Sequence, residues 1–339
     1  MSAVAATPRR TCYLHIGLPK TGTTCLQASL AGNREWLAER GLSYPRTGCG
    51  APDPIGHHAL ASALGFASTI QGDQDNVLPA LQAELRSVEG DCLISSEEFS
   101  KLLPAADGNS LRRLLRGFRV KVVAYLRRQD EWAASLYGQV LAARFLKDAN
   151  LPRFLPFLRR PFMRQSLDFL RPLEFWGSVF GANNVLVRGY GAETLRGGDI
   201  ITDFFSLLDL SENGQFVRAK RVNHSLPVQT VEALRLASSL PIRRELRRQL
   251  REAITSRMRA ATGGEGLRLR NLVTAEHQAY IRNVVRDSNA ALLRSGFDTG
   301  GVDLGRLLAL TPFDARPLSL DDYRLIFQTI AEAAEALDG

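Results

Sequence analysis

The stretch that most constrains this chain is residues 13–24, where a short apolar segment passes through a glycine-containing turn into a helical pattern. It reads Tyr-Leu-His-Ile-Gly-Leu-Pro-Lys-Thr-Gly-Thr-Thr. Gly17 and Pro19 end the apolar segment, and residues 25–30 continue as a helix. A strand, a loop and a helix N-terminus together expose unpaired backbone N–H groups at the positive end of the helix dipole. The stretch therefore predicts an anion-binding site.

The loop is similar to the phosphate loop of nucleoside triphosphatases in glycine spacing, but not in the position of its lysine. Gly17 and Gly22 are five residues apart, as that motif requires, yet Thr23 stands where its lysine belongs. The lysine of this chain, Lys20, lies inside the loop instead. A simpler interpretation is a Gly/Thr-rich connection with a solvated lysine, and the flanking strand and helix favour the anion site over it.

The rest of the N-terminal two thirds alternates between helical and strand patterns. Residues 91–95, 120–126 and 184–188 are short apolar runs typical of buried parallel strands, and helical patterns follow them. This alternation predicts an α/β fold, a three-layer α/β/α arrangement around a central parallel sheet of the P-loop NTPase-like type. Beyond residue 211 the patterns are helical, so a mostly helical C-terminal portion is expected.

We predict one domain over residues 1–339. Its α/β nucleotide-binding core spans 11–210 and carries an insertion at 146–175, and residues 211–339 form the helical part. Within the insertion, residues 147–172 are rich in proline, phenylalanine and arginine. This composition predicts either an irregular basic segment near an acceptor site or the ordinary packing of a long connection.

Polar side chains follow two of the predicted strands. Arg127 comes directly after the strand at 120–126, and Ser135 lies eight residues further on. Ligands of open parallel sheets bind outside the carboxyl ends of the strands, so both residues can reach one phosphate there. Glu97 and Glu98 follow the strand at 91–95. Ser95 and Glu98 fit a capping box, which leaves Glu97 without a structural role.

Charge and composition narrow the class of protein further. The chain has 339 residues and a net charge of +8, which favours anionic ligands. It has no apolar run of the ~20 residues that span a bilayer, and its first ten residues lack a signal-peptide core. Four cysteines without metal-ligand spacing predict a reduced, cytoplasmic protein without a metal. No zinc-finger or RNA-recognition motif is present, so a nucleic-acid partner is not expected.

These pieces together resemble the sulfotransferase family, whose donor is 3′-phosphoadenosine 5′-phosphosulfate (PAPS). The match covers roughly residues 12–30, 91–145 and 184–210, and bacterial carbohydrate-type members are the most similar in kind. The resemblance implies the PAPS-binding residues Pro19, Lys20, Thr21, Gly22, Thr23, Thr24, Arg127, Ser135 and Tyr190. The loop would hold the 5′-phosphosulfate, Arg127 and Ser135 the 3′-phosphate, and Tyr190 would lie near the adenine.

The chain departs from the animal cytosolic branch of that family in three ways. Cys25 stands where an aromatic residue follows the loop, and no C-terminal Arg-Lys-Gly motif is found, so Arg268 and Arg270 are suggested as its substitute. Glu97 stands where the catalytic histidine is expected. Other branches use glutamate as the base, so the replacement is chemically reasonable.

The resemblance implies catalytic roles for Lys20, Glu97 and His57. Lys20 would stabilise charge on the leaving 5′-phosphate, and a general base would take the proton of the acceptor hydroxyl. The base is open among Glu97, Glu98, His57 and His58, the two histidines being equally well explained as an exposed pair at a helix start.

The expected function is therefore transfer of a sulfuryl group from PAPS to a hydroxyl, in a carbohydrate or glycoconjugate acceptor, without a metal. The basic, aromatic segment at 147–172 favours that acceptor class. Two alternatives are a P-loop kinase or NTPase-like enzyme and a basic, non-enzymatic binder of acidic glycan. A comparison of how strongly 3′,5′-adenosine bisphosphate and ATP–Mg bind to the protein distinguishes the sulfotransferase from these alternatives.

Overall fold

A computed structural model describes residues 10–50, 55–67, 74–219, 226–264, 266–312 and 315–338. The chain divides into two compact units that each draw on three sequence segments. Unit 1 comprises residues 1–127, 169–222 and 288–307, and unit 2 comprises residues 128–168, 223–287 and 308–339. The prediction of a single domain over 1–339 stays a prediction.

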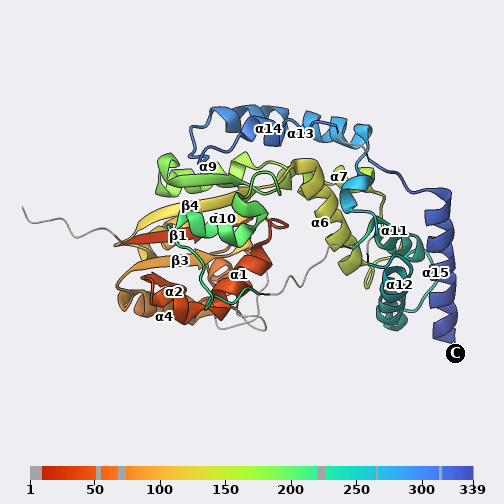
Figure 1. Cartoon of the computed structure of the whole chain (residues 1–339), viewed down its shortest axis with the longest axis horizontal. Coiled ribbons are helices and arrows are strands. Elements are labelled where there is room, and N and C mark those ends of the chain that lie inside the picture. The colour runs from red at the N-terminus through yellow and green to blue at the C-terminus, as the bar shows by residue number, and fades with distance from the viewer. Residues whose placement is uncertain are drawn as a thin grey trace, which may run out of the picture. The chain divides into compact units, whose positions relative to one another are not determined.

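Unit 1 is built on a five-stranded sheet in which every neighbouring pair is parallel (Figure 1). The strand order is β2-β3-β1-β4-β5. The strands are β1 (Thr11–His15), β2 (Leu42–Ser43), β3 (Asp91–Ser95), β4 (Arg119–Leu126) and β5 (Val185–Gly189). In this order β1 lies between β3 and β4, so the segments that follow these three strands leave the sheet at one edge.

One face of the sheet is covered by α1 (Thr23–Gly32), α2 (Arg34–Ala38) and α10 (Ile200–Leu207). Tyr13, Leu93 and Tyr125 point from the strands into this core, where Trp36 and Phe204 meet them. A buried ion pair crosses the same layer. Asp203 of α10 accepts from Arg188 of β5 at 2.9 Å and from the Tyr125 hydroxyl at 2.7 Å, and also from the backbone N–H of residue 196.

The other face of the sheet is covered by α9 (Leu170–Phe180). Residues 185 and 188 of β5 mark the two faces, because successive side chains of a strand point to opposite faces. Arg188 faces α10, whereas Val185 lies beside Gly177 of α9. Trp176 of α9 stacks on Phe66 and donates its indole N–H to the Phe99 carbonyl at 2.9 Å. The helices thus form layers on both faces of a parallel sheet, which confirms the predicted α/β/α class.

The remaining elements are mostly helices. In unit 1 they are α3 (His58–Ala63), α4 (Gln74–Arg86), η1 (Glu97–Ser100), α5 (Gly108–Leu114), η2 (Ala182–Asn184) and η3 (Arg196–Gly198). Unit 2 contains α6 (Gln129–Arg144), α7 (Phe154–Leu158), α8 (Pro161–Ser166), α11 (Val228–Ala237), η4 (Arg244–Leu246), α12 (Arg247–Ala261), η5 (Leu269–Leu272) and α15 (Leu320–Asp338). Two helices, α13 (Ala275–Arg294) and α14 (Leu304–Leu308), contribute residues to both units.

Several local expectations from the sequence are corrected. Asp130 would be a plausible N-cap for the helix after the strand at 120–126, but the cap position is Arg128, and Asp130 is instead buried against the Arg128 guanidinium at 2.7 Å. Residues 147–172 are not simply irregular, because α7 and α8 lie within them. The short strand β2 was not expected, since its two residues follow a helical pattern too closely to show a period of their own. The helical character beyond residue 211 is confirmed for the described residues, apart from one isolated bridge at Asp298.

Removal of the Asp203 carboxylate should destabilise unit 1 strongly. In Asp203→Ala, the mostly buried Arg188 guanidinium loses its counter-charge, and breaking a buried pair from one side costs about 3–5 kcal/mol. The measurement is the free energy of unfolding in urea. Glu193→Ala is the control, because the Glu193–Arg306 pair is exposed on both sides and should contribute at most about 1 kcal/mol. Equal losses in the two variants would contradict this account.

Candidate active site

The loop between β1 and α1 adopts an unusual backbone conformation. Gly17, Lys20 and Gly22 have φ angles of 58°, 70° and 78°. Such angles suit glycine, but Lys20 has a Cβ and is one of few non-glycine residues of the described chain in this region. Gly22 is also the N-cap of α1, which begins without a side-chain cap. The loop therefore presents a helix N-terminus beside a conformationally constrained lysine.

Gly17 allows the loop to lie against the segment that follows β3. A Cβ at Gly17 would be 3.0 Å from the Cα and the Cβ of Glu97 and 3.0 Å from Thr23 Cγ2. Such distances are tighter than most real Cβ contacts and the φ angle is positive, so a larger residue would be strained here and its neighbours would have to shift. The structure thus brings Glu97 directly beside the loop.

Glu97 and Glu98 differ sharply in their surroundings. Both oxygens of Glu98 accept from Lys101 Nζ at 2.7 Å. Glu97 Oε2 is buried and has no hydrogen-bond partner among the described residues. A buried, unsatisfied carboxylate oxygen is rare and calls for a functional explanation. The predicted capping box is wrong in its first member, because Ser96 and not Ser95 accepts from the Glu98 N–H, at 3.2 Å.

Lys20 lies within electrostatic reach of Arg127 and of Glu97. Burial, followed by the Arg127 guanidinium, lowers the pKa of Lys20, and the Glu97 carboxylate opposes that shift. Two cations facing the same space repel one another, and an anion between them removes that cost. This part of unit 1 thus favours a bound anion.

Tyr190 lies on the other side of the loop. Its backbone N–H donates to the Leu126 carbonyl at 2.6 Å, directly beyond the paired ends of β4 and β5. A Cβ at Gly22 would be 3.0 Å from Tyr190 Cε2 and 3.1 Å from its hydroxyl oxygen. The Arg127 guanidinium carbon is 6.0 Å from the centre of the Tyr190 ring. The structure therefore brings together the loop, Arg127 and Tyr190.

The other predicted loop residues have separate positions. The Thr21 hydroxyl donates to the Leu18 carbonyl at 2.7 Å and so holds the turn closed. Thr23 is buried, Thr24 is exposed, and Pro19 is partly buried.

Ser135 lies in unit 2, on α6, whereas Arg127 belongs to unit 1. The Ser135 side chain is buried, and its Oγ has no hydrogen-bond partner within the described chain. A buried hydroxyl without a partner is compatible with a ligand contact. Joint action of Arg127 and Ser135 on one phosphate stays a prediction. The suggested substitutes Arg268 and Arg270 are both exposed in unit 2, at η5.

A layer of buried polar side chains lies at the strand ends beneath Glu97. Ser95 Oγ is 2.8 Å from His15 Nδ1 and accepts from Gln27 Nε2 at 3.1 Å. The Ser95 backbone N–H donates to His57 Nδ1 at 3.2 Å. Sequence reasoning missed His15 and Gln27, although the position of His15 at the end of a strand just before the loop was a usable signal.

The two adjacent histidines have different environments. His57 is fully buried, its Nδ1 is taken by the Ser95 N–H, and burial lowers its pKa to about 3. His58 is only partly buried, and its Nδ1 lies 2.8 Å from Ser96 Oγ. His57 is thus a neutral, fixed side chain, and the idea of an exposed pair does not hold for it.

Two further observations concern the described residues as a whole. None of their helices is both long enough and apolar enough to cross a membrane. Their His, Cys, Asp and Glu side chains form no group of three or more that could hold a metal ion.

The free energy of unfolding should decrease as the pH falls from about 6.5 towards 3, in part because of His57. In the unfolded chain His57 takes up a proton near its ordinary pKa of 6.5, whereas the folded protein resists protonation down to about 3. One such group gives a slope of up to about 1.4 kcal/mol per pH unit. His57→Asn keeps an acceptor for the Ser95 N–H but cannot titrate. Its unfolding free energy, measured in urea between pH 6 and pH 4, should change less steeply by about that amount, and an unchanged slope would contradict the burial argument.

Comparisons with known proteins give two similarities. No family model matches the chain. An uncharacterized protein from Archaeoglobus fulgidus is 26% identical over 214 residues, which are 61% of this chain and 54% of that protein, so the chain spans about half the length of the curated relative it matches. The crystal structure of mouse sulfotransferase SULT7A1 complexed with PAP aligns with 96% of this chain and 84% of that chain, at 12% identity and a TM-score of 0.33.

Proposed function

We propose that this chain is a PAPS-dependent sulfotransferase that transfers a sulfuryl group to a hydroxyl of an acceptor. The observation that carries the proposal is the meeting of the β1–α1 loop, Arg127 and Glu97 in unit 1. A cationic loop suits an anionic donor, and an unpaired carboxylate oxygen beside it suits a hydroxyl that must lose a proton. Few other tasks need both groups at one strand edge.

The donor end of the site would be formed by the loop. The first N–H groups of α1 and the hydroxyls of Thr23 and Thr24 would bind the 5′-phosphosulfate, as at other helix N-termini. Lys20 would stabilise the negative charge that grows on the leaving 5′-phosphate oxygen as the S–O bond breaks. Its lowered pKa reflects burial and the Arg127 charge, and a bound dianion would raise that pKa again.

The nucleotide end would be held by Arg127, Ser135 and Tyr190. Arg127 would form charge-assisted hydrogen bonds with the 3′-phosphate, and the unpartnered Ser135 hydroxyl would complete them. Tyr190, in contact with Gly22, would offer a ring near the adenine in place of the aromatic residue that Cys25 replaces.

Glu97 would act as the general base. Its Oε2 would accept the proton of the acceptor hydroxyl while that oxygen bonds to sulfur. We assign His57 a positioning role, because its Nδ1 holds the Ser95 N–H two residues before Glu97. Glu98 is occupied by Lys101 and is therefore a poor alternative.

We further propose a carbohydrate or glycoconjugate acceptor. The support lies in the basic segment at 147–172, where Arg159, Arg164 and Phe162 are exposed, although Phe154 and Phe157 pack inside unit 2. Incubation of the protein with labelled PAPS and a panel of glycans, lipids and phenols tests the acceptor class directly.

Nucleotide preference tests the donor assignment. Calorimetric titration should give tighter binding of 3′,5′-adenosine bisphosphate than of 5′-AMP or ATP–Mg. Arg127→Ala should remove most of the preference for the 3′-phosphate, at least about tenfold, because a charge-assisted hydrogen bond contributes roughly 1.5–3 kcal/mol. Affinity for 5′-AMP should change little.

Arg128→Ala is the matched control for Arg127→Ala. The Arg128 guanidinium is bound to Asp130 within unit 2, so its loss should leave the 3′-phosphate preference intact. Equal weakening of both nucleotides in Arg127→Ala would mean that Arg127 only supports the fold. Tighter binding of ATP–Mg than of the bisphosphate by the wild type would favour a kinase or NTPase-like enzyme.

Glu97→Gln should lower the turnover number by about 10²–10⁴-fold while the nucleotide still binds, because the amide cannot take a proton. Glu98→Gln is the neighbouring control and should stay near wild-type turnover. His57→Asn should cost less than Glu97→Gln. If His57→Asn were folded but inactive and Glu97→Gln were active, His57 would be the general base and Glu97 would not.

A further inference from the structure

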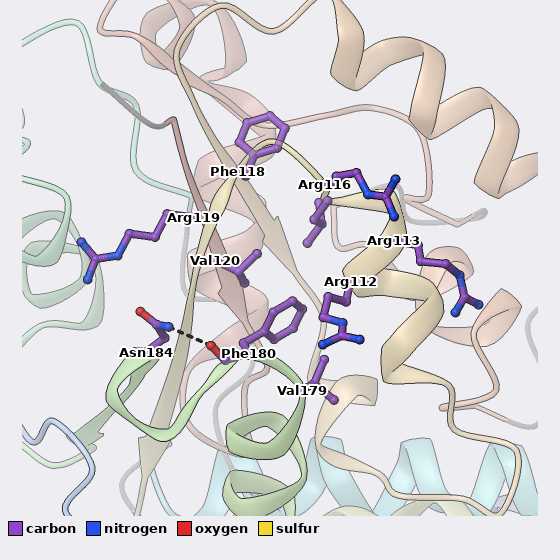
Figure 2. A pocket seen from close by; sticks show the side chains of 10 residues that line it. Arg112, Arg113, Arg116, Phe118, Arg119, Val120, Val179, Phe180 and Asn184 are labelled. Carbon is purple, nitrogen blue, oxygen red and sulfur yellow. Dashed lines mark hydrogen bonds between the residues drawn. The ribbon is translucent and has the colours of Figure 1, made fainter. Parts of the chain in front are cut away.

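Unit 1 has a hollow of about 440 Å³ at the opposite end of β4 from Arg127. It is formed by the end of α5, the turn that leads into β4, and the end of α9 with the residues after it (Figure 2). β4 runs from Arg119 to Leu126, and eight extended residues span about 23 Å. The hollow is therefore separate from the candidate active site.

Arginine side chains dominate the rim of this hollow, and apolar groups form its floor. Its lining includes Leu115, Phe118, Val120, Val179 and Phe180 together with Arg112, Arg113, Arg116 and Arg119. In Figure 2, Arg112 and Arg116 lie on the same side of β4 as Phe180, whereas Arg119 extends to the other side of the strand. Arg113 points away from Phe180 in the same view.

Arg112 and Arg116 form no ion pair with the acidic side chains that the structure describes. Across the described residues, no carboxylate lies within ion-pair distance of either guanidinium, and both side chains are exposed. Arg113, by contrast, donates to Ser110 and lies 3.9 Å from Asp107. Arg112 lies in the last turn of α5, where a cation interacts favourably with the negative end of the helix dipole, but Arg116 lies beyond the helix. Helix stabilisation thus does not explain the pair.

The guanidinium groups at the rim indicate the chemical class of the ligand. A guanidinium fork donates two parallel N–H groups to an oxyanion. Sulfate and phosphate esters have three terminal oxygens. Two of these oxygens can accept from one guanidinium, and the third can still accept from a second arginine. Asn184, which also lines the hollow, donates its amide N–H₂ to the Phe180 carbonyl at 2.7 Å and so fixes the end of α9 beside it. The volume suits a ligand the size of one or two sugar rings.

We propose that this hollow is a second anion site, which binds a sugar-sized ligand carrying two or more sulfate or phosphate groups. Arg112 and Arg116 hold the anionic groups, and Phe180 contacts the ring. The site does not depend on the proposed sulfotransferase activity, because it shares no residue with the loop, Arg127 or Glu97.

The test is binding of sucrose octasulfate and of myo-inositol hexakisphosphate, measured by calorimetry at physiological salt. The full-length wild type should bind at least one of them with 1:1 stoichiometry at the hollow, and Arg112→Ala/Arg116→Ala should weaken binding at least tenfold. Arg113→Ala/Arg119→Ala is the matched control, since it removes the same charge from the same segment but from side chains that point elsewhere. It should retain most of the affinity.

Four outcomes would overturn the proposal. Equal weakening in the two double variants would reduce the site to a diffuse basic patch, and no binding of either probe would remove it. Citrate binding as tight as that of the esters would contradict the ligand class. The two soluble probes distinguish sulfate from phosphate as the preferred group. Vesicles that contain phosphatidylinositol bisphosphate serve as a third arm, and a protein that binds these vesicles but neither soluble probe would also overturn the proposal.

Two controls separate this site from the candidate active site. Lys20→Ala should leave binding at the hollow unchanged, and Arg112→Ala/Arg116→Ala should still bind 3′,5′-adenosine bisphosphate, so the failure of one site is distinguishable from the failure of the other.

Discussion

The close approach of Gly17 to Glu97 is the constraint on which the candidate active site depends. Parallel pairing of β1 with β3 and with β4 brings their carboxyl ends to one edge. The absence of a Cβ at Gly17 lets the loop after β1 lie directly against Glu97. A larger residue at this position would be strained and would force the loop and the Glu97 segment, which are the two parts of the candidate site, to shift relative to each other.

The buried polar layer of His15, His57 and Ser95 fixes the strand ends beside the loop, and this arrangement lowers the stability of the fold. His15 and His57 are fully buried, and burial lowers the pKa of each to about 3, so both are neutral at physiological pH. They position Ser95 without adding charge. The positive charge that faces Glu97 therefore comes from Lys20, while Glu97 Oε2 forms no hydrogen bond with any residue of the described segments. Such an unsatisfied group lowers stability, which is typical of a site arranged for a ligand that is not part of the fold.

Much of this was accessible from the sequence, and the exceptions have physical reasons. The loop, the strands β3 and β4 and the positions of Glu97 and Arg127 follow from short-range patterns of apolar residues and glycine. The buried layer of His15, Gln27 and Ser95 depends on residues 68 and 80 positions apart, so no local pattern reveals it. The cap at Ser96 was misassigned to Ser95 because these two adjacent serines fit the start of the same short pattern. The arginines of the second anion site lie on a basic segment of the sequence, and only the packing of the turn at 115–118 beside α9 shows that they surround a hollow.

The two ends of the sheet must bind anions by different means. In a parallel sheet with crossover helices, helix N-termini lie at the carboxyl ends of the strands, and helix C-termini lie at the opposite edge. At the carboxyl edge the backbone of α1 supplies part of the positive potential, so one lysine and one arginine suffice beside it. At the other edge the C-terminus of α5 is negative, and the potential must come from side chains. Arg112 and Arg116, at and just beyond the end of α5, therefore supply the charge that offsets the helix end and attracts an anion.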